Sequence, residues 1–135
     1  MTLHLRQVSP STSETTIRTH QILIDRPVAK GGADRGPMGG ELFLASVGGC
    51  FMSNLLAAIH SRNAHISGVC TEVTGILAEV PPVRFTAIEL RVTADAADAD
   101  QLEHLVEIAD RGCIMMNTLR GTLDLRVSIG APSFP

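Results

Sequence analysis

The sequence predicts a single α+β domain, and the order of its elements is the first reason. Strand patterns, a long apolar helix, two more strands, an amphipathic helix and a last strand follow one another, as is typical of α+β folds. The length of 135 residues corresponds to one domain, residues 1–135, with a sizeable core. The composition, 44% apolar and 19% charged, fits a globular protein.

The N-terminal part reads as strands followed by a loop. Residues 1–25 are expected to form short strands, because β-branched residues and alternation recur between Thr15 and Ile24. Residues 26–40 contain five glycines and two prolines, which predicts a loop. A loop of this length is usually functional or mobile.

Residues 41–62 are predicted to form a central helix about 33 Å long. The stretch from Leu42 to Ile59 carries no charge and approaches the length of a membrane span. Small and polar residues inside it, bracketed by Glu41 and His60, favour a buried core helix instead. Because so short a chain has few elements to cover this helix, we expect an obligate homodimer with two long helices packed at its centre.

The remaining region, residues 66–129, is predicted to run strand, strand, helix, strand. Residues 66–78 and 84–94 form a strand pair, with Pro81-Pro82 excluding a helix between them. Residues 98–110 have the spacing of an amphipathic helix, and Asp100 with Glu103 resembles a capping box.

The C-terminal part continues with a turn and a strand. Residues 112–121 are expected to be a short helical turn or a loop. Residues 122–129 alternate strictly between apolar and polar side chains, which predicts a strand.

Composition also excludes several classes of function. The net charge is -3, the 11 basic residues are scattered, and Trp and Tyr are absent, which argues against a nucleic-acid partner. The N-terminus lacks the apolar region of a secretory signal. The three cysteines are too few and too widely spaced for a disulfide scaffold, so we expect a cytoplasmic protein without a membrane partner.

Cys50 is the leading candidate for chemistry, because Gly48-Gly49 directly precede it inside the predicted helix. Glycine costs a helix interior about 0.5–1 kcal/mol, so the pair indicates a close approach of backbone or substrate, or a helix crossing. A break in the helix there would place Cys50 at a new helix N-terminus, whose N–H groups stabilise a thiolate. In an unbroken helix, an arginine would have to lower the pKa.

The other candidates cannot be ranked from the residues alone. Arg18, Arg26 and Arg35 lie before or inside the glycine-rich loop, and each could equally be a solvated surface residue. Cys113 follows a glycine in the predicted turn and can meet Cys50 only through the fold. Cys70 fits an inert thiol.

Two motifs resemble the OsmC/Ohr family. The segment 36–50, GPMGGELFLASVGGC, is similar to the family pattern GPxPxELLLAALGGC, and CIMMNTLR at 113–120 is similar to its second-cysteine motif, CPxSNxL. Asp25-Arg26-Pro27 with Gly31-Gly32 resembles the lead-in of OsmC-like members. The resemblance covers about residues 15 to 129.

The resemblance implies a thiol-dependent peroxidase that reduces organic hydroperoxides, in which Cys50 attacks and Cys113 resolves. It also implies an intertwined α+β homodimer with two active sites at the interface. No metal or organic cofactor is expected, and an external thiol or dithiol would be the reductant. A small apolar hydroperoxide is the expected substrate.

The sequence departs from the pattern near the site. Peroxidase members carry a glutamate that orients the catalytic arginine, and here Gly40 stands at its position with Glu41 beside it. On a straight helix Glu41 would point away from Cys50, about 13.5 Å along the axis, and would take part only if the helix breaks or the partner chain uses it. After Cys113, residues 114–116 replace the usual Pro and Ser.

The predicted catalytic residues are therefore Cys50, Cys113, Arg18, Arg26 and Glu41. Two alternatives stay open: an OsmC-like dimer without peroxidase activity that binds a small apolar ligand at the subunit interface, and a metal site. The metal site would combine the cysteines with a histidine, but the chain has no C-x-x-C or H-x-x-x-H spacing. Apolar residues near the cysteines could line a pocket, although core packing is the preferred interpretation: Phe43, Phe51, Met52, Met115 and Met116.

Overall fold

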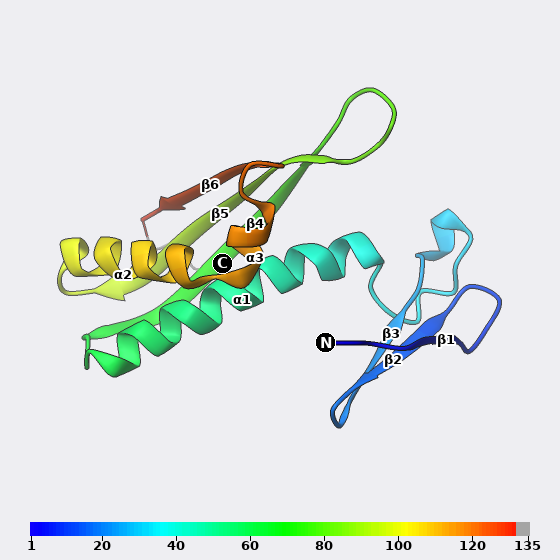
Figure 1. Cartoon of the computed structure of the whole chain (residues 1–135), viewed down its shortest axis with the longest axis horizontal. Helices are drawn as coiled ribbons and strands as arrows, with labels where there is room; N and C mark the ends of the chain where they lie inside the picture. The colour runs from blue at the N-terminus through cyan, green and yellow to red at the C-terminus, as the bar shows by residue number, and fades with distance from the viewer. Residues whose placement is uncertain (132–135) are drawn as a thin grey trace. The chain divides into compact units, whose positions relative to one another are not determined.

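The computed structural model describes residues 1–131, and it confirms the α+β class. The chain forms two compact units, residues 1–43 and the part from Leu44 onward, and each is described here by itself. Figure 1 labels the elements. They are β1 (Leu5–Gln7), β2 (Ser13–Ile17), β3 (His20–Ile24), the 3-10 turn η1 (Val28–Lys30), α1 (Gly39–Ser61), β4 (Ile66–Leu77), β5 (Phe85–Ala96), α2 (Ala99–Gly112), α3 (Ile114–Leu119) and β6 (Asp124–Ile129).

The first unit is a three-stranded antiparallel sheet followed by a loop that is folded around a carboxylate. The strand order is β1-β2-β3. Asp25, only 3% exposed, accepts hydrogen bonds from the Thr12 hydroxyl at 3.0 Å and from the Arg26 and Arg35 amides at 2.7 and 3.2 Å. The segment predicted as a loop thus has a fixed internal anchor.

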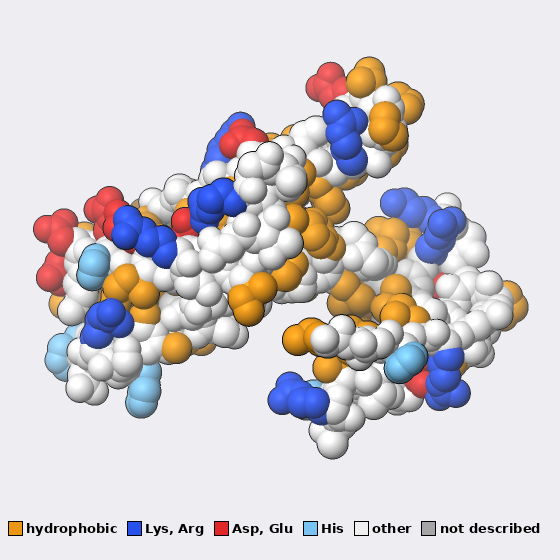
Figure 2. All heavy atoms as spheres, viewed as in Figure 1, with side chains coloured by type: hydrophobic (Ala, Val, Ile, Leu, Met, Phe, Trp, Pro, Cys, Tyr) orange, Lys and Arg blue, Asp and Glu red, His pale blue; other side chains and the backbone are white. Residues whose placement is uncertain are grey.

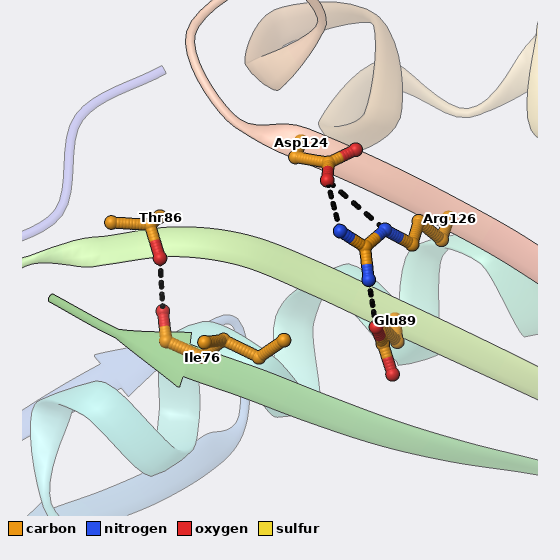
Figure 3. A network of polar contacts seen from close by, with 5 residues as sticks. All are labelled: Ile76, Thr86, Glu89, Asp124 and Arg126. Carbon is orange, nitrogen blue, oxygen red and sulfur yellow. Dashed lines mark hydrogen bonds and ion pairs between the residues drawn. The ribbon is translucent and has the colours of Figure 1, made fainter.

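The second unit contains the other sheet, in the order β4-β5-β6. β4 and β5 form the predicted strand pair and run antiparallel, whereas β6 lies parallel to β5. Ile88, Leu90 and Val92 of the central strand are fully buried. On the other face, Arg126 of β6 bonds to Asp124 and, at 2.6 Å, to Glu89 of β5 (Figure 3).

The hairpin between β4 and β5 carries apolar side chains into solvent. Leu77, Val80 and Val83 are 53%, 68% and 73% exposed. Figure 2 shows hydrophobic side chains gathered at the tip of this hairpin, beside acidic and basic side chains. The tip therefore has no apolar cover from the described residues of its own unit.

Helix α1 is one continuous helix of 23 residues, so of the two possibilities left open at Gly48-Gly49 the unbroken helix is observed. A Cβ at Gly48 would lie 2.6 Å from Cγ2 of Val73, so this glycine lets the helix approach strand β4 closely. A Cβ at Gly49 would meet nothing within 4 Å. The two glycines therefore differ: Gly48 allows α1 to pack closely on β4, whereas Gly49 lies on the exposed side of the helix.

One face of α1 is buried and the opposite face is not. Val47, Phe51 and Leu55 are fully buried, whereas Leu56 is 48% exposed. By length and composition alone the helix could cross a membrane, a test that core helices of globular proteins also pass. Its packing against β4 agrees with the predicted core helix.

Helix α2 buries the four residues that its spacing predicted, namely Leu102, Leu105, Val106 and Ala109. The predicted capping box is wrong. The N-cap is Asp98, whose side chain accepts from the amides of Asp100 and Gln101, because Asp98 has the extended backbone that an N-cap requires. The predicted turn after α2 is the short helix α3.

Candidate functional site

The second unit brings the Cys50 and Cys113 thiols together. Cys50 lies in the middle of α1, and Cys113 occupies the corner at which α2 ends and α3 begins. The two thiols are close enough for each to shift the pKa of the other. Both are free thiols; Cys113 is fully buried, whereas Cys50 is partly exposed. Of the two residues, only Cys50 is therefore accessible to solvent.

Backbone amides at the start of α3 make Cys50 the more acidic thiol. The Met115 amide is the largest influence and lowers the pKa of Cys50 below the ordinary 9.0. Burial opposes this shift, while the Cys113 thiol and the Ile114 amide add to it. N–H groups therefore stabilise the thiolate, as expected for a helix N-terminus, but a different helix supplies them.

Cys113 is shifted in the opposite direction. Burial raises the pKa of Cys113 above 9.0, the Met116 amide opposes the shift, and the neighbouring Cys50 raises the pKa further. Cys113 therefore remains a neutral thiol at neutral pH, and Cys50 is the thiol that ionises first. The two sulfurs thus have distinct roles available: Cys50 can attack as the more easily formed thiolate, with a neutral thiol beside it.

Hydrogen bonds fix the corner that carries Cys113. The Asn117 side chain donates to the Arg111 carbonyl at 2.9 Å, and the Cys113 amide donates to the Asp110 carbonyl at 3.3 Å. Arg120 forms an ion pair with Asp110 at 3.0 Å. The same few residues therefore hold the end of α2 to the start of α3 and orient the α3 amides toward Cys50.

The predicted charged residues all belong to the first unit. Arg18 has a left-handed backbone, φ 58°, in the turn between β2 and β3, and Arg26 and Arg35 flank the Asp25 anchor. All three arginines are exposed. Glu41 accepts a hydrogen bond from the Met38 amide at 2.7 Å, a contact at the start of α1. Their catalytic roles stay predictions.

The apolar neighbours of the cysteines divide between core and surface. Phe51 and Met116 are fully buried and pack the core. Met52 and Met115 are half-buried, and the Met52 sulfur accepts a hydrogen bond from the Thr71 hydroxyl at 2.9 Å. Met52 and Met115 are therefore the candidates for contacting a substrate.

Two further features lie apart from the two cysteines. Cys70 is exposed on β4, on the same side as Glu72 and Thr74. A cavity of about 550 Å³ lies between α2 and β6, lined by residues such as Val106 and Val127 but by neither cysteine. Within residues 1–131, no three His, Cys, Asp or Glu side chains gather as metal ligands.

Sequence reasoning missed the backbone donors and one side chain. The amides of Ile114 and Met115 depend on α3 starting directly after Cys113, and a helix there was only one of the two predicted possibilities. Asn54 donates to the Cys50 carbonyl at 2.9 Å. Its position one turn after Cys50 was a signal for this contact.

Comparison with known proteins places this arrangement in a family. A family model described as OsmC-like protein matches residues 31–128. Among curated protein sequences, no relative matches the chain.

Several solved structures share the fold. An OsmC-like protein from Mycoplasma pneumoniae has a TM-score of 0.84 at 16% identity, covering 98% of this chain and 96% of that one. A putative osmotic stress induced and detoxification response protein from Psychrobacter arcticus has a TM-score of 0.82 at 17% identity, covering 96% of both chains. An organic hydroperoxide resistance protein OsmC from Legionella pneumophila has a TM-score of 0.74 at 21% identity, covering 96% and 95%. The match of the family model over most of the sequence, with the same fold in these structures, shows that the chain belongs to the OsmC-like family.

Proposed function

We propose that this protein is a thiol-dependent peroxidase that reduces organic hydroperoxides through Cys50. The observation that carries the proposal is the pairing of an acidified, partly exposed thiol with a buried neutral thiol that lies close enough to shift its pKa. The motifs of both cysteines and the names of two relatives, from Legionella pneumophila and Bacillus subtilis, support the substrate class.

The first step uses the thiolate. Cys50 attacks the outer oxygen of the hydroperoxide, the O–O bond breaks, and the alkoxide leaves as an alcohol after taking a proton. Cys50 becomes a sulfenic acid. The amides of Ile114 and Met115, which favour negative charge on the sulfur, keep the nucleophile in its reactive form before the substrate arrives.

The second step uses the neighbouring thiol. The Cys113 sulfur attacks the sulfenic sulfur, the S–O bond breaks, and oxygen leaves as water with the Cys113 proton. An external thiol or dithiol then reduces the disulfide by exchange. The cycle needs no metal and no organic cofactor.

The charged residues of the first unit are proposed to assist the first step. Arg18 or Arg26 would stabilise the departing alkoxide, and Glu41 would orient the guanidinium. Substituting each arginine by glutamine, with Arg35→Gln as the matched control, assigns the role. The catalytic arginine is the one whose loss lowers the rate of Cys50 oxidation by about tenfold or more, since one charged hydrogen bond at a reaction centre supplies ~10²-fold.

We further propose that the chain works as a cytoplasmic homodimer, without nucleic-acid or membrane partners. The exposed face of α1, centred on Leu56 at 48% exposure, supports this assembly, because a second copy can bury that apolar face. Ala45, Gly49 and Ser53 are exposed on the same face, and their small side chains allow two helices to approach closely.

Consumption of cumene hydroperoxide with dithiothreitol tests the peroxidase. Cys50→Ser should abolish turnover, Cys113→Ser should turn over only with small monothiols, and Cys70→Ser is the matched control that should retain full activity. Full activity in Cys50→Ala would refute the proposal. Absence of consumption by the wild-type protein would favour the alternative, an OsmC-like dimer that binds a small apolar ligand.

A further inference from the structure

One side chain, Asn54, touches both segments that carry the paired cysteines. Its amide nitrogen donates to the Cys50 carbonyl at 2.9 Å. On its other side, a Cβ built on Gly112 would lie 3.2 Å from the Asn54 Oδ1 and 3.8 Å from its Cγ. Gly112 is the last residue of α2 and directly precedes Cys113. Asn54 therefore spans the gap between the helix of Cys50 and the corner of Cys113.

The backbone does not explain why position 112 is glycine. Gly112 lies within α2 and does not have the left-handed backbone seen at Gly31 or Gly121. In a helix, alanine is preferred over glycine by up to about 1 kcal/mol. The contact with Asn54 does explain it, because a Cβ there is closer than ordinary packing allows and something must move by a few tenths of an ångström.

Hydrogen bonds around the contact make Cys113, and not Asn54, the residue that moves. Asn54 is held by its bond to the Cys50 carbonyl, so it cannot retreat freely. The corner after Gly112 is tied by the Asn117 bond to Arg111, and Cys113 itself is fully buried. A displacement of residue 112 therefore moves Cys113 with it, away from α1.

We propose that the contact between Asn54 and Gly112 sets the separation of the Cys50 and Cys113 sulfurs, and with it the rate at which Cys113 captures oxidised Cys50. Both are positioning residues, and the inference rests on the proposed function. In the step concerned, Cys113 is oxidised and the Cys50 sulfur is reduced from sulfenic acid to disulfide, with water leaving; the hydroperoxide supplied the oxidising equivalents.

The expected effect follows from the geometry of the bond that forms. A disulfide needs its sulfurs at about 2.05 Å, within a narrow range of dihedral angles. Misplacement of a reacting group by about 1 Å can cost ~10²-fold in rate, so a few tenths of an ångström should cost roughly three- to tenfold. The attack of Cys50 on peroxide does not involve Cys113 in bond making. It depends on the displaced corner only through the pKa of Cys50, so its rate should fall by less than the rate of disulfide formation.

The first experiment is a single turnover of Gly112→Ala with cumene hydroperoxide, with a sulfenic-acid trap as reporter. We expect three- to tenfold slower disulfide formation, a smaller change in the rate of Cys50 oxidation, and more trapped sulfenic acid. Gly39→Ala is the control, since its Cβ would meet nothing within 4 Å and it also lies at a helix end. In an Asn54→Ala background, Gly112→Ala should have no effect, because the obstacle is gone.

The outcomes separate cleanly. Any of three results would overturn the inference: Gly112→Ala forms its disulfide at the wild-type rate, it slows both steps equally, or it slows disulfide formation just as much in the Asn54→Ala background. If Gly112→Ala fails to fold, Asn54→Gln adds one methylene to the same contact from the α1 side. Disulfide formation should then slow by the same factor, and an unchanged rate of disulfide formation in Asn54→Gln would overturn the inference.

A second measurement keeps this inference distinct from the proposed peroxidase. Equilibration of the Cys50–Cys113 pair with a glutathione redox buffer reports how well the two sulfurs meet, with no peroxide present. Gly112→Ala should lower the effective concentration of one thiol at the other, measured from this equilibrium, roughly three- to tenfold. This should hold even if the wild-type protein consumes no peroxide. An unchanged equilibrium would overturn the inference whatever the peroxidase assay shows.

Discussion

Adding one methyl group at Gly48 should reveal how tightly helix α1 is seated on strand β4. The new Cβ would lie 2.6 Å from Cγ2 of Val73, closer than carbon atoms approach without displacement. Overpacking of this kind costs about 1–3 kcal/mol. Replacing glycine by alanine in a helix interior stabilises the folded state by up to about 1 kcal/mol. We therefore expect Gly48→Ala to lower the free energy of unfolding by about 1 kcal/mol.

The same substitution should change sign when the obstacle is removed. Val73→Ala deletes the methyl group that the new Cβ would meet, so only the helix preference remains. In the Val73→Ala background, Gly48→Ala should raise the free energy of unfolding by up to about 1 kcal/mol. The coupling energy between the two positions should therefore be about 1–2 kcal/mol, within the range seen for residues in contact.

Urea unfolding followed by circular dichroism measures all four proteins of this cycle. The protein concentration must be held constant, because association shifts apparent stability. A gain of stability from Gly48→Ala in the wild-type background would refute the reasoning. So would a coupling energy near zero, since the strand side chain would then not be what excludes a Cβ at position 48.

Three further predictions address the site, the anchor of the first unit and the assembly. The pH midpoint for alkylation of Cys50 should fall below 9.0, the ordinary thiol value, and the corresponding phase should vanish in Cys50→Ser; a midpoint at or above 9.0 contradicts the role of the α3 amides. Burial raises the pKa of Asp25, but the amides of Arg26 and Arg35 and nearby hydroxyl groups outweigh burial and lower the pKa from 3.8 to about 2. The stabilisation that the Asp25 carboxylate gives the folded state is therefore present above pH 3.8 and lost as pH falls toward 2. The acid unfolding of Asp25→Asn should lack this part of the pH dependence. Leu56→Lys should shift the protein toward monomer in sedimentation velocity, since it places a charge on the exposed face of α1; an unchanged dimer would show that this face is not the interface.

Side-chain periodicity was enough to predict the elements. The spacing of Leu102 and Leu105 identified α2, and alternation in 122–129 identified β6, because these patterns follow from which face is buried. The N-cap was missed, since several aspartates stand near the start of α2 and only the local backbone decides that Asp98 caps it. The sequence left open whether the helix breaks at Gly48-Gly49, because Gly48 reflects its contact with Val73, a long-range fact absent from the local sequence.

The site was predicted only in part, and side-chain periodicity did not contribute to that prediction. Cys50 was selected by the glycine pair that precedes it in the predicted helix, whereas its pairing with Cys113 came from motif resemblance, since no spacing rule relates two residues so far apart. The groups that acidify Cys50 are backbone amides, which every residue has and no side-chain pattern reveals. Asn54 and Gly112 read locally as an ordinary polar residue and an ordinary helix end, and only their proximity in the fold gives them a shared role.

The unequal burial of the two sulfurs bears on how their disulfide would be opened. In the proposed cycle, an incoming reductant would attack the Cys50 sulfur, because Cys113 is fully buried, and the transient mixed disulfide would form at Cys50. The departing group is then Cys113, whose raised pKa makes it a reluctant thiolate. Regeneration would thus be the slow half of the cycle, and under a steady supply of peroxide most molecules would be waiting in the oxidised form for a reductant.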